Sequence, residues 1–329
     1  MGVTTGLRPK PRRYTMSDRR REILERLSAG EIDVGQAEEE LRRLEGKTGL
    51  LHSIRSCLDN LDICLELGNR IALEEEICGQ LEPGPVELDL LTVNGSIRIE
   101  TWDSPQYRLL IKKRVRAADQ QEAEDIARQY KIADIRDNVI RARVPDQARP
   151  RRICAVSLLL QLPRGHAVSG AIETANGSVT LTGLENHGLR VRTSNGSIIA
   201  EHLHGGPLTA NTVNGSIKAA GSLSQMEAGT TNGSITLHAA ALDGDVSLKT
   251  VNGSIKVFWP GGQDTALALS ASTVTGRIAV EHWQLGKRSL SGFGNKFVEA
   301  RSVNWEQAAR KLSLECSTVN GSITLKETE

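Results

Sequence analysis

A six-residue phrase recurs along this chain, and its spacing restricts the fold more than any other feature. One copy reads Thr-Val-Asn-Gly-Ser-Ile at 250–255. Further copies occupy 92–97, 174–179, 193–198, 212–217, 230–235 and 318–323, and a degenerate copy occupies 273–278. From Asn176 to Asn252 the Asn-Gly steps recur every 18 to 20 residues. Such a period predicts one supersecondary unit stacked on copies of itself.

Apolar and polar residues alternate around each copy. In the copy at 250–255, Val246 and Leu248 precede the threonine by four and two positions, and Ile255 and Val257 follow the glycine at matching parity. Period-two alternation predicts short strands with one buried and one exposed face. The threonine falls on the same strand face as the buried apolar residues, so we expect its hydroxyl to form a hydrogen bond with a backbone group at the corner. The Asn-Gly step is expected to supply the turn, because both residues tolerate a positive φ.

Two arrangements of these strands fit the repeat. Asn-Gly between alternating segments is a strong hairpin signal, and a hairpin would place each threonine opposite the isoleucine of its own copy. In a β-solenoid, equivalent residues of successive coils stack on one another, and stacked asparagines form hydrogen-bonded ladders. A meander of hairpins gives no reason for every second turn to repeat one phrase. The solenoid is therefore favoured over the meander.

The composition argues against several classes of protein. The chain has 329 residues, a net charge of +1 and 3% aromatic residues. These values argue against dominant attraction to nucleic acid or an acidic membrane, and against a base-stacking platform. The cysteines are odd in number and lack C-x-x-C spacing, and no segment has the pattern of a signal peptide or membrane span. A cytoplasmic location is therefore expected. The cysteines are Cys57, Cys64, Cys78, Cys154 and Cys316.

The N-terminal part of the chain has a helical pattern. Residues 1–15 are expected to be a disordered basic tail. In residues 16–46, Ser17 and Asp33 each begin a short amphipathic helix, and such a helical hairpin is too small to bury a core alone. In residues 47–70 the apolar residues keep helical spacing. This fits either a linker helix that packs on its own chain or a coiled-coil surface through which copies of the chain associate.

Residues 71–329 are expected to form the β domain, with an N-terminal capping region that extends to about residue 167. A helix at 119–131 interrupts the strand pattern between the first and second copies. We expect it to cap the open end of the array, because an uncovered end would expose unpaired strands. Residues 283–309 are expected to form an enlarged last coil that closes with the final repeat.

The repeated phrase resembles that of the bacterial putative-adhesin family of domains of unknown function, which are built from β-strand repeats. Residues 16–46, with Gly-Glu-Ile at 30–32 and Ala-Glu-Glu at 37–39, resemble the SHOCT-like hairpin that precedes such domains in some members. The resemblance implies a mainly β fold, a right-handed parallel β-solenoid with repeats of about 19 residues. It implies no enzyme activity, catalytic residue or cofactor. Some relatives are encoded in cell-envelope stress operons.

No catalytic, cofactor-binding or metal-binding residue is predicted. His202 and His204 would share one strand face, but no third ligand is evident. H-E-x-x-H, G-x-S-x-G and Walker motifs are absent, and Asp243 and Asp245 stand apart from other carboxylates, so a polysaccharide-cleaving groove is not expected.

Two basic segments, 112–116 and 149–152, are candidates for contact with phospholipid headgroups or an acidic protein; the alternative is a solvated strand face.

Two functions fit these observations. The first is a non-enzymatic interaction platform or adaptor, which the helical hairpin recruits to a protein partner such as a membrane-associated envelope-stress component. Such a protein would be cytoplasmic or peripheral at the membrane, without a transmembrane segment or a nucleic-acid partner. The alternative is a self-assembling, filament-forming scaffold or a surface adhesin. The last coil is expected to discriminate, because a flat open edge would favour polymerisation.

Overall fold

The computed structural model describes residues 69–144, 152–242, 244–260, 265–281, 285–291 and 296–328. The predicted tail at 1–15, the helical hairpin at 16–46 and the linker up to residue 68 lie outside these residues. The described part confirms the mainly β fold, with 23 strands and one short helix.

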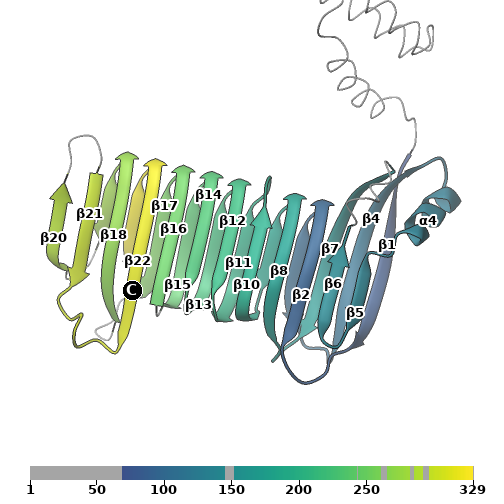
Figure 1. Cartoon of the computed structure of the whole chain (residues 1–329), viewed down its shortest axis with the longest axis horizontal. Coiled ribbons are helices and arrows are strands. Elements are labelled where there is room, and N and C mark those ends of the chain that lie inside the picture. The colour runs from purple at the N-terminus through teal and green to yellow at the C-terminus, as the bar shows by residue number, and fades with distance from the viewer. Residues whose placement is uncertain are drawn as a thin grey trace, which may run out of the picture. The chain divides into compact units, whose positions relative to one another are not determined.

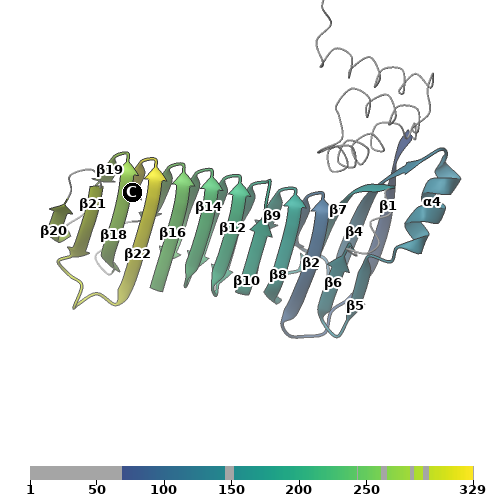
Figure 2. The same ribbon diagram turned by 45° about the horizontal axis from the view of Figure 1, so that its top comes forward.

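The strands form two rows that share one core (Figures 1 and 2). The first row precedes the Asn-Gly corner, and the second follows it. In spatial order the first row contains β5 (Ala133–Arg136), β6 (Val139–Arg143), β2 (Val86–Asn94), β8 (Ala167–Asn176), β10 (Glu185–Thr193), β12 (Leu208–Asn214), β14 (Met226–Asn232), β16 (Gly244–Asn252), β22 (Arg310–Asn320), β18 (Thr265–Thr275), β21 (Lys296–Ser302) and β20 (Leu285–Ser291). The second contains β1 (Asn69–Gln80), β4 (Gln106–Ala117), β7 (Ile153–Pro163), β3 (Ile97–Trp102), β9 (Val179–Thr182), β11 (Ile198–Gly205), β13 (Ile217–Leu223), β15 (Ile235–Leu242), β17 (Ile255–Pro260), β23 (Ile323–Thr328) and β19 (Ile278–Glu281).

Equivalent residues of neighbouring repeats pair with each other. In the first row Thr212 pairs with Thr230 between the parallel strands β12 and β14. In the second row Ile217 pairs with Ile235 between β13 and β15, which are also parallel. A hairpin meander would instead pair a threonine with the isoleucine of its own copy. The two strands that flank an Asn-Gly step therefore belong to different rows.

Burial confirms the predicted alternation. Ile255 and Val257 are fully buried, whereas Lys256 between them is exposed. Before the corner, Val246 and Leu248 are also buried. Removing an aliphatic side chain of this size from water contributes about 1.5–3 kcal/mol, so the alternating pattern fixes which face of each strand lies inside.

Threonine and asparagine tie the coils together at the corner. The hydroxyl of Thr230 donates a hydrogen bond to the carbonyl oxygen of Gly215 in the neighbouring coil, over 2.9 Å. Six other threonines make equivalent bonds, as expected from their position on the buried face, whereas Thr92 donates to Gly95 of its own copy. The asparagine side chains form an unbroken ladder in which each amide donates to the next Oδ1 over 2.7–2.9 Å. Its members are Asn94, Asn176, Asn195, Asn214, Asn232, Asn252 and Asn320.

The glycine of the phrase is needed for a reason other than the predicted one. A left-handed conformation was expected, yet Gly95 at φ 157° is the only described member of the glycine series with a positive φ. The requirement is close approach between coils. A Cβ added at Gly253 would overlap the carbonyl oxygen of Gly233, and one at Gly233 would overlap that of Gly215. The prediction of a positive φ at these glycines was therefore wrong. The glycines instead stack on one another from coil to coil, and we call this stack the glycine ladder.

The N-terminal end of the array is covered by β1, β4 to β7 and the helix α4 (Gln120–Gln129). The Asp119 side chain accepts a hydrogen bond from the Glu122 backbone N–H and caps this helix. Ala123, Ile126 and Ala127 are buried on its inner face. They pack in a small cluster with other residues of β4, separate from the main core.

The C-terminal end differs from the expected enlarged coil. β20 and β21 pair antiparallel, and β21 also pairs antiparallel with β18. The final repeat does not close the array. Instead β22 lies between β16 and β18, and β23 lies between β17 and β19. The degenerate repeat, which precedes the final repeat in sequence, therefore occupies the last coil in space.

Candidate interaction surface at the N-terminal cap

The outer face of β1, β4, β7 and β3 carries a row of polar side chains that crosses four strands. The register places Arg108 of β4 opposite Cys78 of β1 and opposite Gln161 of β7. Gln161 in turn lies opposite Glu100 of β3. Because side chains alternate between the two faces of a strand, these residues share the outer face while their neighbours fill the core.

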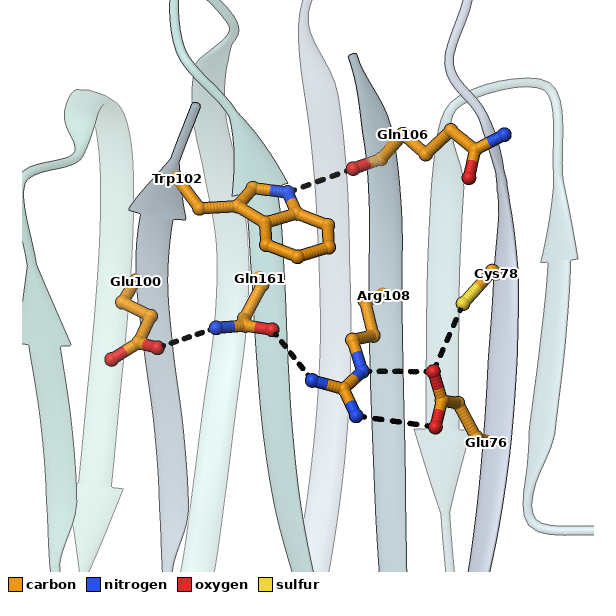
Figure 3. Close-up of polar contacts among 7 residues, drawn as sticks. All are labelled: Glu76, Cys78, Glu100, Trp102, Gln106, Arg108 and Gln161. Atoms are coloured by element: carbon orange, nitrogen blue, oxygen red, sulfur yellow. Dashed lines mark hydrogen bonds and ion pairs between the residues drawn. The ribbon is translucent and has the colours of Figure 1, made fainter. Parts of the chain in front are cut away.

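Hydrogen bonds connect the row from end to end (Figure 3). The guanidinium of Arg108 donates from Nε and Nη2 to the two carboxylate oxygens of Glu76, over 2.9 and 3.2 Å, and from Nη1 to Oε1 of Gln161 over 3.4 Å. The Gln161 amide donates to Oε1 of Glu100 over 2.8 Å. The thiol of Cys78 donates to Glu76 over 3.4 Å. The row is therefore held in one arrangement by its own contacts.

These contacts alter the acid–base behaviour of the row. Hydrogen bonds from Arg108 and then from Cys78 lower the pKa of the Glu76 carboxyl. Partial desolvation, followed by the bond to the Glu76 carboxylate, raises the pKa of the Cys78 thiol. Glu76 is thus ionised and Cys78 protonated near neutral pH, so the thiol is not activated as a nucleophile.

Trp102 lies at the rim of this row. Its indole Nε1–H donates to the backbone oxygen of Gln106 over 2.8 Å, which fixes the ring while leaving it half-buried (Figure 3). Tryptophan and arginine dominate protein interfaces, because each offers a large contact area together with hydrogen bonds. We call the surface formed by Glu76, Glu100, Trp102, Arg108 and Gln161 the cap face.

The basic segment at 112–116 contacts acidic residues of the same chain. Nζ of Lys112 lies 2.7 Å from the Glu74 carboxylate. Lys113 is buried and lies 2.7 Å from Glu75. For these two lysines the predicted external electrostatic partner is replaced by the acidic stretch at 74–76. Of the other basic segment, 149–151 lies outside the described residues, and Arg152 pairs with Glu122.

The two strand histidines do not assemble a metal site. His202 and His204 are both exposed on β11, and His202 has a φ of 54° where the pairing with β13 shifts register. Within the part of the chain that the structure describes, no group of three or more His, Cys, Asp or Glu side chains is arranged to hold a metal. Asp243 lies outside the described residues.

Sequence reasoning missed the cap face. The available signal was the pair of stretches Glu-Glu-Glu at 74–76 and Lys-Lys-Arg at 112–114, which suggests cross-strand pairing when both are read as strands. The contribution of Trp102 and Gln161 was not visible, because it depends on the lateral order of β4, β7 and β3, which are not consecutive in the chain.

The fold and this surface define a mainly β repeat protein with an open sheet, whose ordered polar face has no evident reactive group. The chain belongs to the Toastrack DUF4097 family, whose model matches residues 87–326. No curated protein sequence matches it. Within the described residues, no helix combines the length and apolar character needed to span a bilayer.

Three solved structures illustrate the similarity. A protein from Bacteroides fragilis described as a putative adhesin is 14% identical, with 79% of this chain and 99% of that one covered and a TM-score of 0.40. A putative adhesin from Parabacteroides distasonis is 13% identical, with 79% and 98% covered and a TM-score of 0.37. A putative cell adhesion protein from Clostridium sporogenes is 11% identical, with 78% and 100% covered and a TM-score of 0.36.

Proposed function

We propose that this chain is a non-enzymatic interaction platform that binds a protein partner through the cap face. The observation that supports this proposal is the row around Arg108, whose guanidinium donates hydrogen bonds to Glu76 and to Gln161 in the free chain. Side chains fixed before binding lose less conformational entropy when a partner docks. The half-buried Trp102 beside them supplies apolar area for such a contact.

We further propose that the repeats form a right-handed parallel β-solenoid with a period of about 19 residues. The in-register pairing of threonine, asparagine and isoleucine between neighbouring coils supports this arrangement. A stack tied by the asparagine and glycine ladders would be a stiff support for the cap face. The cytoplasmic location stays a prediction; Cys78, Cys154 and Cys316 are free thiols, as a reducing compartment would leave them.

The second candidate function, an end-to-end filament, is less favoured by the geometry. Three of the four row ends, β1, β5 and β20, are antiparallel strands, and only β19 ends its row in parallel pairing, with β23. Among the described residues, a second copy could therefore not continue the parallel register of both rows at either end. β1 also carries the charged stretch at 74–76, and charged edge strands oppose edge-to-edge association.

The proposal is tested by comparing proteins retained by the immobilised full chain and by two double variants. Trp102→Ala with Arg108→Met alters the cap face, and Phe258→Ala with Lys256→Met removes an aromatic and a cation from the outer face of β17. A protein lost with the first variant and kept with the second, and then shown to bind the purified chain by calorimetry, is the expected result. A partner lost only with the second variant, or filaments of the purified chain in light scattering, would overturn the proposal.

A further inference from the structure

The loop between β21 and β22 carries the most exposed large apolar side chain of the described residues. Val303 is 74% exposed. It lies in the connection of residues 303–309, at the lower left of Figure 1, which leads from the C-terminal hairpin to the final repeat. Two residues further on, Trp305 is half-buried. The other exposed valines, Val213, Val251, Val274 and Val319, are only 41–47% exposed, and Val303 differs from them in its greater exposure.

Two cations flank the tryptophan. The guanidinium carbon of Arg301 lies 4.8 Å from the centroid of the Trp305 ring, and Nζ of Lys311 lies 5.7 Å from it. The register explains this placement, because Arg301 of β21 and Lys311 of β22 both pair with the intervening strand β18, opposite Ala268 and Ala266. Both cations are exposed, and neither forms an ion pair with a carboxylate of the described residues.

Some exposed cations elsewhere have carboxylate partners, as Lys112 has Glu74, Lys249 has Glu315 and Lys326 has Glu281. Others, such as Lys218 and Lys256, have none among the described residues. At Trp305, two cations without a carboxylate partner lie over one aromatic ring. Residues 285–311 contain six basic and two acidic residues, whereas the whole chain has a net charge of only +1. This stretch therefore has a net charge of +4, from six basic minus two acidic residues.

We propose that Arg301, Val303, Trp305 and Lys311 form a docking site for an anionic phospholipid surface. Tryptophan and the stems of arginine and lysine favour the boundary between water and acyl chains, where the cations meet lipid phosphates and an exposed valine enters the apolar layer. An acidic protein would neutralise the two cations but would leave no apolar layer for Val303, which is 74% exposed. The combination of cations, tryptophan and exposed valine therefore favours a lipid surface over an acidic protein.

The site lies at the opposite end of the array from the cap face (Figures 1 and 2). Docking through the loop would leave the cap face free to bind a protein. The lipid proposal therefore does not depend on the proposed function, and each can fail without the other.

Vesicle flotation with the full chain tests the site. Vesicles of phosphatidylcholine with phosphatidylglycerol are compared with vesicles of phosphatidylcholine alone. We expect binding only to the anionic vesicles, and a decrease with rising salt. Each cation near such a surface contributes about five-fold in affinity, so Arg301→Gln with Lys311→Gln should weaken binding about 30-fold. Val303→Ser leaves the charge unchanged and removes the exposed apolar side chain, so it should also weaken binding to the anionic vesicles.

The matched control is Lys218→Gln with Lys256→Gln, which removes two exposed lysines from the outer face of β13 and β17. This variant should bind within two-fold of the unchanged chain. Equal losses in the two double variants would overturn the proposal, as would binding to phosphatidylcholine vesicles alone at the same level. Retention of an acidic polyglutamate peptide without any vesicle binding would assign the loop to an acidic protein instead.

Discussion

The hydroxyl of Thr275 donates a hydrogen bond to Oδ1 of Asn320 over 2.8 Å and ends the asparagine ladder. Thr275 stands where the other copies have asparagine, and it belongs to the last coil in space. Its hydroxyl occupies the Oδ1 acceptor of Asn320, and it has no amide group that could continue the ladder. At the other end, Nδ2 of Asn94 donates to the backbone oxygen of Cys154 over 3.2 Å. Both ends of the ladder are thus closed by the chain itself, and the degenerate repeat provides one of these ends.

Breaking the ladder in its middle should cost more than removing its end. Asn232→Ala loses the bonds to Asn214 and from Asn252, whereas Thr275→Val loses the bond to Asn320. At about 0.5–1.5 kcal/mol per hydrogen bond, we expect a loss of about 1–3 kcal/mol for Asn232→Ala and about 1 kcal/mol for Thr275→Val. Urea titration of both variants measures the difference. If the unchanged chain and both variants have the same free energy of unfolding, water replaces the hydrogen bonds of the ladder without a loss of stability.

The glycine positions should tolerate substitution less well than the asparagine positions. Gly253→Ala should destabilise the chain by at least about 1–3 kcal/mol, because the added methyl group overlaps the carbonyl oxygen of Gly233 and forces two coils apart. The matched variant is Gly165→Ala, where φ is 85° but a Cβ would meet nothing within 4 Å. It isolates backbone strain, which costs about 1 kcal/mol. If urea titration ranks Gly165→Ala as the more damaging change, close approach is not what the phrase requires.

Local alternation was enough to predict the repeats. The parity of residues such as Ile255 and Lys256 determines the inner and outer faces, and the threonine hydroxyl was placed correctly from parity alone. The role of Gly253 was misassigned, because the restriction comes from the backbone of the neighbouring coil and not from its own φ. Nothing in a local pattern reports the distance between two coils.

Lateral strand order was the part that the sequence could not supply. The final copy at 318–323 has the standard phrase, so nothing in it indicates that β22 inserts between β16 and β18. The same limitation hid the cap face. Arg108 and Gln161 are far apart in the chain and become neighbours only through the β4–β7 pairing.

The Glu76–Arg108 pair should make the cap face sensitive to acid. The pKa of Glu76 is lowered in the folded chain, chiefly by the hydrogen bond from Arg108. Its stabilising contribution is therefore present above the ordinary glutamate pKa of about 4.3, and it is lost as pH falls through the lower folded value. The melting temperature of Arg108→Met should lie below that of the unchanged chain at pH 6 and approach it toward pH 3. A difference that grows on acidification would contradict the assignment.

The buried ammonium of Lys113 should hold α4 on the cap. It donates to the Glu75 carboxylate over 2.7 Å and to the carbonyl oxygens of Ala127 and Tyr130 over 3.2 and 3.4 Å, at the C-terminal end of the helix. A cation at that end also interacts favourably with the helix dipole. Lys113→Met keeps the stem but removes all three bonds, so about 1.5–3 kcal/mol of helix docking should be lost.

Hydrogen exchange separates this local effect from global unfolding. In Lys113→Met, amides of 120–129 should exchange faster while those of β12 and β14 keep their protection, because α4 packs in a small cluster apart from the main core. Lys112→Met is the matched control, since Lys112 forms a bond of the same length to Glu74 but is 53% exposed. Exposed ion pairs contribute about 0–1 kcal/mol, so that variant should leave exchange in α4 unchanged. Equal acceleration in the two variants would show that the helix is held by its apolar face alone.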